Sequence, residues 1–73
     1  MPSDSTILLS IVVPVYNEEL IIDELVRRMV AAAESITPQY EIIFVNDGSR
    51  DSSLAKLRVA TAENERLYYI NFS

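Results

Sequence analysis

The stretch EIIFVNDGSR, residues 41–50, passes from apolar residues directly into a polar turn. Its first half is rich in β-branched and aromatic residues, which is typical of a buried strand. It ends without a spacer on Asn46, Asp47 and Gly48, the only glycine of the chain. Asp and Gly are common turn residues, and glycine adopts positive φ without steric cost. A turn explains these residues, and so does a strand that holds the Asp47 carboxylate at the rim of a site.

Outward from this stretch, strand-like and helix-like segments alternate. Strands are predicted over residues 7–16, 40–45 and 66–72, and helices over 20–36 and from about residue 52. The first helix is indicated by apolar residues three and four apart, namely Ile22, Leu25, Val26, Met29, Ala33 and Ile36. The second has Leu54, Leu57 and Ala60 or Thr61 on its inner face. This β-α-β-α-β order predicts an α/β fold with a parallel sheet and right-handed connections.

The ends of these elements carry their own signals. The first strand is predicted to be buried on both faces, with Pro14 either ending its pairing or lying at its last paired position. Asn17 is a candidate N-cap of the first helix, and the acidic residues 18–19 suit the positive end of its dipole. The pair at 37–38, Thr-Pro, should stop this helix, and Asp51 is placed to cap the second.

Length and composition set further limits. A chain of 73 residues holds one domain at most, and residues 1–6 are expected to form a flexible leader. The absence of cysteine excludes a disulfide framework, and the absence of histidine as well argues against a zinc site. A hydrophobic share of 49% with 1 Gly and 3 Pro argues against disorder. We therefore expect residues 1–73 to be a single partial domain, an ordered piece of something larger.

The charge pattern excludes other classes. The formal net charge is −5, and no basic cluster is longer than the pair Arg27-Arg28, so binding to duplex nucleic acid is not expected. No apolar run reaches the roughly 18 residues of a membrane span. The N-terminus has no basic residue before its apolar run, unlike a secretory signal. A cytoplasmic location is the expectation.

Two polar loops should leave the same edge of the predicted sheet. Residues 14–18 follow the first strand and residues 46–49 follow the second. Ligands of open parallel sheets bind outside the carboxyl ends of the strands, and adjacent strands lie about 4.8 Å apart. Carboxylates of Glu18 and Asp47 can accept hydrogen bonds from a base or a ribose, and Tyr16 offers an aromatic wall. No glycine-rich loop is present, so the phosphates of a nucleotide would be neutralised elsewhere.

The two loop motifs together resemble a known family. SIVVPVYNEE, residues 10–19, followed about 30 residues later by YEIIFVNDGSRDSS, residues 40–53, is similar to the N-terminal nucleotide-binding half of inverting family 2 glycosyltransferases. The closing LYYINFS, residues 67–73, resembles the third strand of the subgroup that includes dolichol-phosphate mannosyltransferases and bactoprenol glucosyltransferases. The resemblance implies a truncated, Rossmann-like, three-layer half of the GT-A fold.

The resemblance also implies a nucleotide-sugar site. Its residues would come from both loops: Pro14, Tyr16, Glu18, Val45 and Asp47, and further Asn17 and Gly48. Val45 would pack beside the base, and Asp47 would hydrogen-bond the base edge. Asn46, where many relatives have Asp, is expected to shape the loop without touching the ligand.

By the same resemblance, the parent enzyme transfers a hexose from a UDP- or GDP-sugar, with inversion, to an acceptor such as a polyprenyl phosphate. It would need Mg²⁺ or Mn²⁺, held by an Asp-x-Asp motif beyond the third strand. Catalytic and metal-binding residues are thus expected outside these 73 residues. The chain alone should be inactive, and the parent would work in cell wall or lipid glycosylation at the cytoplasmic face of a membrane.

Other interpretations stay open. The chain fits a non-catalytic Rossmann-like module for nucleotide binding or protein interaction. An NAD-dependent enzyme, with Asp47 at a ribose 2′-hydroxyl, is disfavoured by the missing glycine loop. A three-stranded sheet should also leave a flank uncovered. The resemblance implies that the first strand is central in the complete sheet, so its open side should be an apolar, unpaired edge, and self-association is expected.

Overall fold

Strands and helices alternate along the chain, as the sequence predicts. The computed structural model describes residues 6–48 and 52–72. In them the elements are, in order, β1 (Leu9–Val15), α1 (Ile22–Ile36), β2 (Tyr40–Asp47), α2 (Ser53–Glu63) and β3 (Leu67–Phe72). Strand β2 is two residues longer than predicted, because Asn46 and Asp47 still pair with Asn71 and Phe72 of β3.

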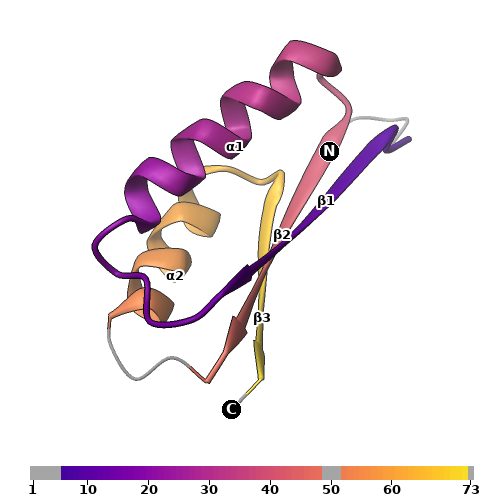
Figure 1. Ribbon diagram of the computed structural model, residues 1–73. Helices are drawn as coiled ribbons and strands as arrows, with labels where there is room; N and C mark the ends of the chain where they lie inside the picture. The colour runs from indigo at the N-terminus through magenta and orange to yellow at the C-terminus, as the bar shows by residue number, and fades with distance from the viewer. Residues whose placement is uncertain (1–5, 49–51, 73) are drawn as a thin grey trace.

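The described strands form one parallel sheet in the order β1-β2-β3. All strand arrows point the same way in Figure 1, and both helices lie on one side of the sheet. This follows from two right-handed connections that step across the sheet in the same direction. The α/β, Rossmann-like prediction is confirmed. The described residues build the sheet and one helix layer, which are two of the three expected layers.

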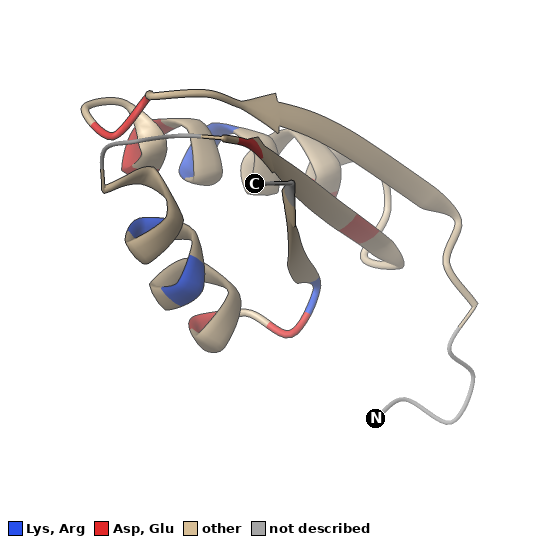
Figure 2. Cartoon of the chain, turned by 90° about the horizontal axis from the view of Figure 1, so that it is seen from below, with Lys and Arg blue, Asp and Glu red and all other residues tan. Residues whose placement is uncertain are grey.

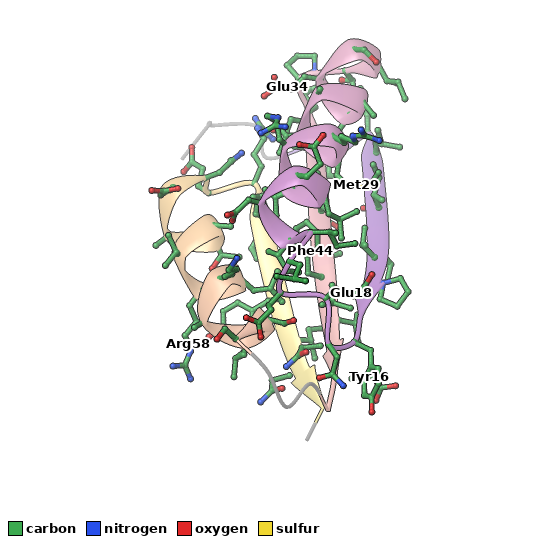
Figure 3. The ribbon with its side chains drawn as sticks, turned by 60° about the vertical axis from the view of Figure 1, so that its left-hand side comes forward. Tyr16, Glu18, Met29, Glu34, Phe44 and Arg58 are labelled. Atoms are coloured by element: carbon green, nitrogen blue, oxygen red, sulfur yellow. The ribbon has the colours of Figure 1, made fainter. Side chains whose placement is uncertain are left out.

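The core lies between the helix layer and the covered face of the sheet (Figure 3). Its buried apolar residues come from all five elements: Val15, Ile22, Ala33, Tyr40, Ile42, Phe44, Leu57 and Leu67. On α1, Leu25, Val26 and Met29 pack against this cluster, as their spacing predicts. Ile36 does not, since it is 70% exposed. It is the last residue of α1, where the helix ends and the chain turns toward β2.

Within residues 6–48 and 52–72, no helix covers the other face of the sheet. Two rows of residues cross it in register: Val12, Ile43 and Tyr68, then Pro14, Val45 and Ile70. We call these six residues the open face. Val12 is 63% exposed, so the prediction that the first strand is buried on both faces is wrong. The physical reason is that both crossover helices pack on the same side.

The ends of the helices agree only in part with their sequence signals. Helix α1 stops at Ile36, and Thr37 is extended with a φ of −160°, as a Thr-Pro pair predicts. The predicted N-cap is wrong, because the N-cap position is Ile21, without a side-chain cap. Asn17 lies outside the helix at a φ of 48°, where it turns the chain after β1. The predicted cap Asp51 lies outside the described residues.

Candidate functional site

The loops after β1 and β2 leave the same edge of the sheet. The two strands are parallel, and Val15 pairs with Asn46, so they end almost level. Glu18 lies three residues beyond Val15, and Asp47 one beyond Asn46. Both carboxylates therefore reach the carboxyl edge, where open parallel sheets bind ligands. An arrangement at opposite ends would have excluded a common site.

Three of the predicted residues share one surface. Pro14 and Val45 are direct partners in the β1–β2 register, and both belong to the open face. Asp47 follows Val45 by two positions, so its side chain lies on the same side of β2. It is exposed. Pro14 and Val45 thus form an apolar surface that borders the Asp47 carboxylate. This arrangement suits a flat base that carries an N–H donor on its edge.

The loop after β1 brings two more predicted residues to this edge (Figure 3). Tyr16 is 58% exposed, so its ring is available to a ligand. Its backbone N–H donates to Oε1 of Glu18 at 3.2 Å. The Glu18 carboxylate therefore also orders its own loop, a role that the sequence interpretation missed. Its other lone pairs can accept hydrogen bonds from a ligand.

Each loop contains a residue in the left-handed region. Asn17 has a φ of 48° and Gly48 a φ of 73°. Asparagine and glycine are the residues that tolerate this conformation best. Gly48 thus serves as turn residue, as one interpretation proposed, and Asp47 still stands exposed at the rim. Turn chemistry and site chemistry are compatible here. Ser49 lies outside the described residues.

Asn46 faces the opposite side of β2 from Asp47. It is 2% exposed, and its Nδ2 donates to Oδ1 of Asn71 at 2.9 Å. Its own Oδ1 is buried and has no hydrogen-bond partner among the described residues. Asn46 thus lies within the sheet and not in a ligand-facing loop. Its partner Asn71 was missed, although both asparagines lie close to the carboxyl ends of adjacent strands.

The described part of the carboxyl edge is acidic. Figure 2 shows acidic segments in the loop after β1 and at the end of β2. The nearby cation Lys56 is engaged, since its Nζ donates to the backbone oxygen of Glu19 at 2.7 Å and lies 3.9 Å from Oδ2 of Asp23. The edge is therefore better suited to the neutral, donor-rich parts of a nucleotide than to its phosphates.

The described residues do not fit a divalent metal. Within residues 6–48 and 52–72, no three His, Cys, Asp or Glu side chains are grouped so that they could hold an ion. Mg²⁺ or Mn²⁺ would need ligands from outside these ranges. In the same ranges, no helix is both long and apolar enough to cross a membrane.

The comparison with known proteins decides the family. The sequence model described as "Glycosyl transferase family 2" matches residues 10–73, which is most of the chain. The chain belongs to glycosyl transferase family 2. The resemblance noted in its two loop motifs is confirmed.

Named relatives agree with this family. A Bacillus subtilis (strain 168) protein, "Uncharacterized glycosyltransferase YkcC", is 47% identical over 64 residues, which are 88% of this chain and 20% of the relative. An "Undecaprenyl-phosphate 4-deoxy-4-formamido-L-arabinose transferase" of Pseudomonas fluorescens (strain SBW25) is 53% identical over 55 residues, 75% of this chain and 16% of the relative. A Shewanella sediminis (strain HAW-EB3) protein of the same name is 50% identical over 54 residues, 74% of this chain and 16% of its own length. The chain spans a fifth or less of these relatives.

Proposed function

We propose that this family 2 segment recognises the nucleoside of a UDP- or GDP-hexose, in a longer protein that transfers the hexose to an acceptor. The observation that carries the proposal is the common edge of Glu18 and Asp47, beside the paired Pro14 and Val45. These four predicted site residues come from two neighbouring strands and the loops that follow them, and they lie at the same end of the sheet. Tyr16, on the same loop as Glu18, adds an exposed aromatic ring.

Each residue has a role that its chemistry allows. The base lies on the apolar surface of Pro14 and Val45, and the Tyr16 ring flanks it, because the faces of a base favour stacking and apolar contact. The Asp47 carboxylate accepts a hydrogen bond from an N–H on the base edge, and the Glu18 carboxylate accepts one from a ribose hydroxyl. Asn17 and Gly48 shape the two loops through their left-handed backbone.

The transfer itself would be a displacement at the anomeric carbon. The acceptor oxygen forms a bond to that carbon as the bond to the diphosphate oxygen breaks, so the configuration inverts and the nucleoside diphosphate leaves. We propose that the catalytic groups and the ligands of Mg²⁺ or Mn²⁺ come from other parts of the longer protein; among the described residues, no three His, Cys, Asp or Glu side chains are grouped to hold an ion. The 73-residue chain alone binds the nucleoside without turnover.

A polyprenyl phosphate is the acceptor that we propose. Two of the relatives above are named as undecaprenyl-phosphate transferases, at 50% and 53% identity. Such an acceptor would place the longer protein at the cytoplasmic face of a membrane, in cell wall or lipid glycosylation. Incubation of the longer protein with UDP- or GDP-[¹⁴C]glucose or mannose and undecaprenyl phosphate should give a labelled lipid.

Calorimetric titration of the longer protein tests nucleoside recognition. UDP, GDP and NADH are titrated separately, with and without Mn²⁺. Binding of UDP or GDP that tightens with Mn²⁺ is the expected result, because metal neutralises the diphosphate at an otherwise acidic edge. Binding of NADH alone would favour the NAD-dependent interpretation. Nucleotide binding without any sugar transfer would favour a non-catalytic Rossmann-like module.

A further inference from the structure

Hydrogen bonds between described residues join the loop after β1 to the start of α2. The backbone N–H of Glu18 donates to Oγ of Ser53 at 3.0 Å. The backbone N–H of Ser52 donates to Oε1 of Glu19 at 3.1 Å. The Nζ of Lys56 donates to the backbone oxygen of Glu19 at 2.7 Å. We call this set of contacts the loop latch.

The loop latch joins segments that are 33 to 37 residues apart in the sequence. Glu19 takes part in two of these hydrogen bonds. Its carboxylate accepts from the backbone N–H of Ser52, and its backbone carbonyl accepts from the Nζ of Lys56. The carboxylate lies at the start of α2, where backbone N–H groups lack helical partners and the helix dipole favours negative charge. Glu19 therefore supports α2, whereas its sequence position alone points to α1.

Two hydrogen bonds of the loop latch, Glu18–Ser53 and Lys56–Glu19, are partly buried. Ser53 is fully buried, so the Glu18–Ser53 hydrogen bond is shielded from water. Lys56 is only part-exposed, and its cationic Nζ makes the contact with the Glu19 carbonyl charge-assisted. These contacts are therefore stronger constraints than exposed surface pairs.

The position of the loop latch connects it to the candidate site. On one side it fixes the loop that carries Tyr16 and Glu18. On the other it fixes the first residues of α2, which follow the turn after Asp47. The loop after β1, which carries part of the proposed nucleoside site, is thus tied to the start of α2.

We propose that Glu19 and Lys56 are positioning residues for nucleoside recognition, which hold the loop that carries Tyr16 and Glu18 against the start of α2 without touching the ligand. This inference rests on the proposed function. It predicts that breaking the loop latch weakens nucleotide binding through increased loop motion, even where all residues that face the nucleotide are intact.

The first test measures the ligand-free longer protein by hydrogen exchange. Lys56→Met removes the cation and keeps an apolar side chain of similar length. Arg58→Met is the matched control, because it removes the same charge from the same helix and its side chain points outward (Figure 3). Lys56→Met should speed amide exchange in residues 16–21 and 52–53, and Arg58→Met should leave it unchanged. Equal exchange in both variants would overturn the loop latch.

The second test measures affinity for UDP and GDP by calorimetry. Lys56→Met and Glu19→Ala should weaken the binding of the preferred nucleotide about fivefold or more, a typical size for coupling between separate groups. Lys56→Arg and Glu19→Gln should recover much of the loss, because each keeps a donor or an acceptor at the same place. Melting temperatures of all variants identify any that fail to fold, and the conservative pair keeps the comparison valid in that case.

The outcomes separate this inference from the proposed function. Faster exchange with unchanged nucleotide affinity would refute the positioning role and leave the proposed function standing. If the wild-type protein binds neither UDP nor GDP, the proposed function fails, and the positioning role fails with it. Faster exchange together with weaker binding, both restored by Lys56→Arg, supports the inference.

Discussion

Asp47 and Asn46 are neighbours in β2 but face opposite sides of the sheet. Asp47 is exposed on the side of the open face, and Asn46 is buried toward the helices. If Asp47 reads the base, Asp47→Asn in the longer protein should weaken UDP or GDP binding about tenfold, since hydrogen bonds to charged groups contribute roughly 1.5–3 kcal/mol. Thermal stability should hardly change, because the side chain is exposed.

Glu41→Gln is the matched control for this variant. Glu41 lies on the same side of β2 at its other end, where it accepts a hydrogen bond from Ser10. The same loss of charge at the amino end should leave nucleotide affinity unchanged. A loss of equal size in both variants would point to the overall charge of the sheet surface and not to base recognition.

Tyr40 predicts a pH effect on stability. Its hydroxyl donates to Oε2 of Glu34 at 3.0 Å, and the Arg66 guanidinium lies 5.4 Å from its ring centre. Burial is the main cause that raises the pKa of Tyr40 above its ordinary value of 10.0. The unfolded chain thus loses the proton first, so the free energy of unfolding should fall as the pH rises above about 10.

Tyr40→Phe should remove this part of the pH dependence. At neutral pH it should also lower stability by about 0.5–1.5 kcal/mol, through loss of the hydrogen bond to Glu34. Urea denaturation between pH 8 and 11 measures both effects. Tyr68→Phe is the control, because the Tyr68 side chain on β3 is half-exposed. A Tyr40→Phe curve parallel to that of the wild type would contradict the assignment.

At the scale of elements, the sequence predicts those features that depend on contacts between residues close together in the chain. The apolar spacing of α1 and its stop at Thr37 follow from the sequence within one helical turn. The length of β2 does not, because its last two residues belong to the strand through pairing with other strands: Asn46 pairs with Val15 and Asn71, and Asp47 pairs with Phe72. Likewise, the sequence position of Glu19 suggests a place near the N-terminus of α1, but its carboxylate accepts a hydrogen bond from Ser52, the N-cap residue of α2.

The candidate site was predictable to the same extent. Each loop carries its own motif, and the parallel order of the strands brings both loops to one edge, so the placement of Tyr16, Glu18 and Asp47 at that edge could be predicted. Lys56 and Asn71 could not, because their partners lie 37 and 25 residues away in the sequence. Such contacts depend on the register between elements, which no short sequence motif specifies.

The hydrogen bond between Asn46 and Asn71 links the ends of β2 and β3. Asn71→Leu alone leaves the buried amide of Asn46 without its partner, which should cost about 1–3 kcal/mol of stability. Replacing both by Leu removes the unsatisfied groups together, so the double variant should be less destabilised than the sum of the single variants. Urea denaturation of the wild type, both single variants and the double variant gives the coupling energy. Additive effects would show that the two side chains are independent.

At the scale of the whole molecule, two surfaces of the described sheet are uncovered: the open face and the outer edge of β1. Among the described strands, β1 pairs on one side only, with β2. Val12 lies on this edge strand and also on the open face, beside Ile43 of β2, which in turn pairs with Tyr68 of β3. Unpaired strand edges and contiguous apolar surfaces both favour association. We therefore propose that the 73-residue chain associates with a second copy through this face.

Sedimentation equilibrium over a wide concentration range tests this association. The wild-type chain should be heavier than a monomer at high concentration, and Val12→Lys should shift it toward the monomer, because a lysine on an edge strand opposes strand pairing and apolar contact. Val59→Lys is the matched control, since Val59 is 59% exposed but lies on α2, away from the open face. An equal shift in both variants would assign the effect to net charge, and a wild-type chain that stays monomeric at high concentration would exclude association through the open face.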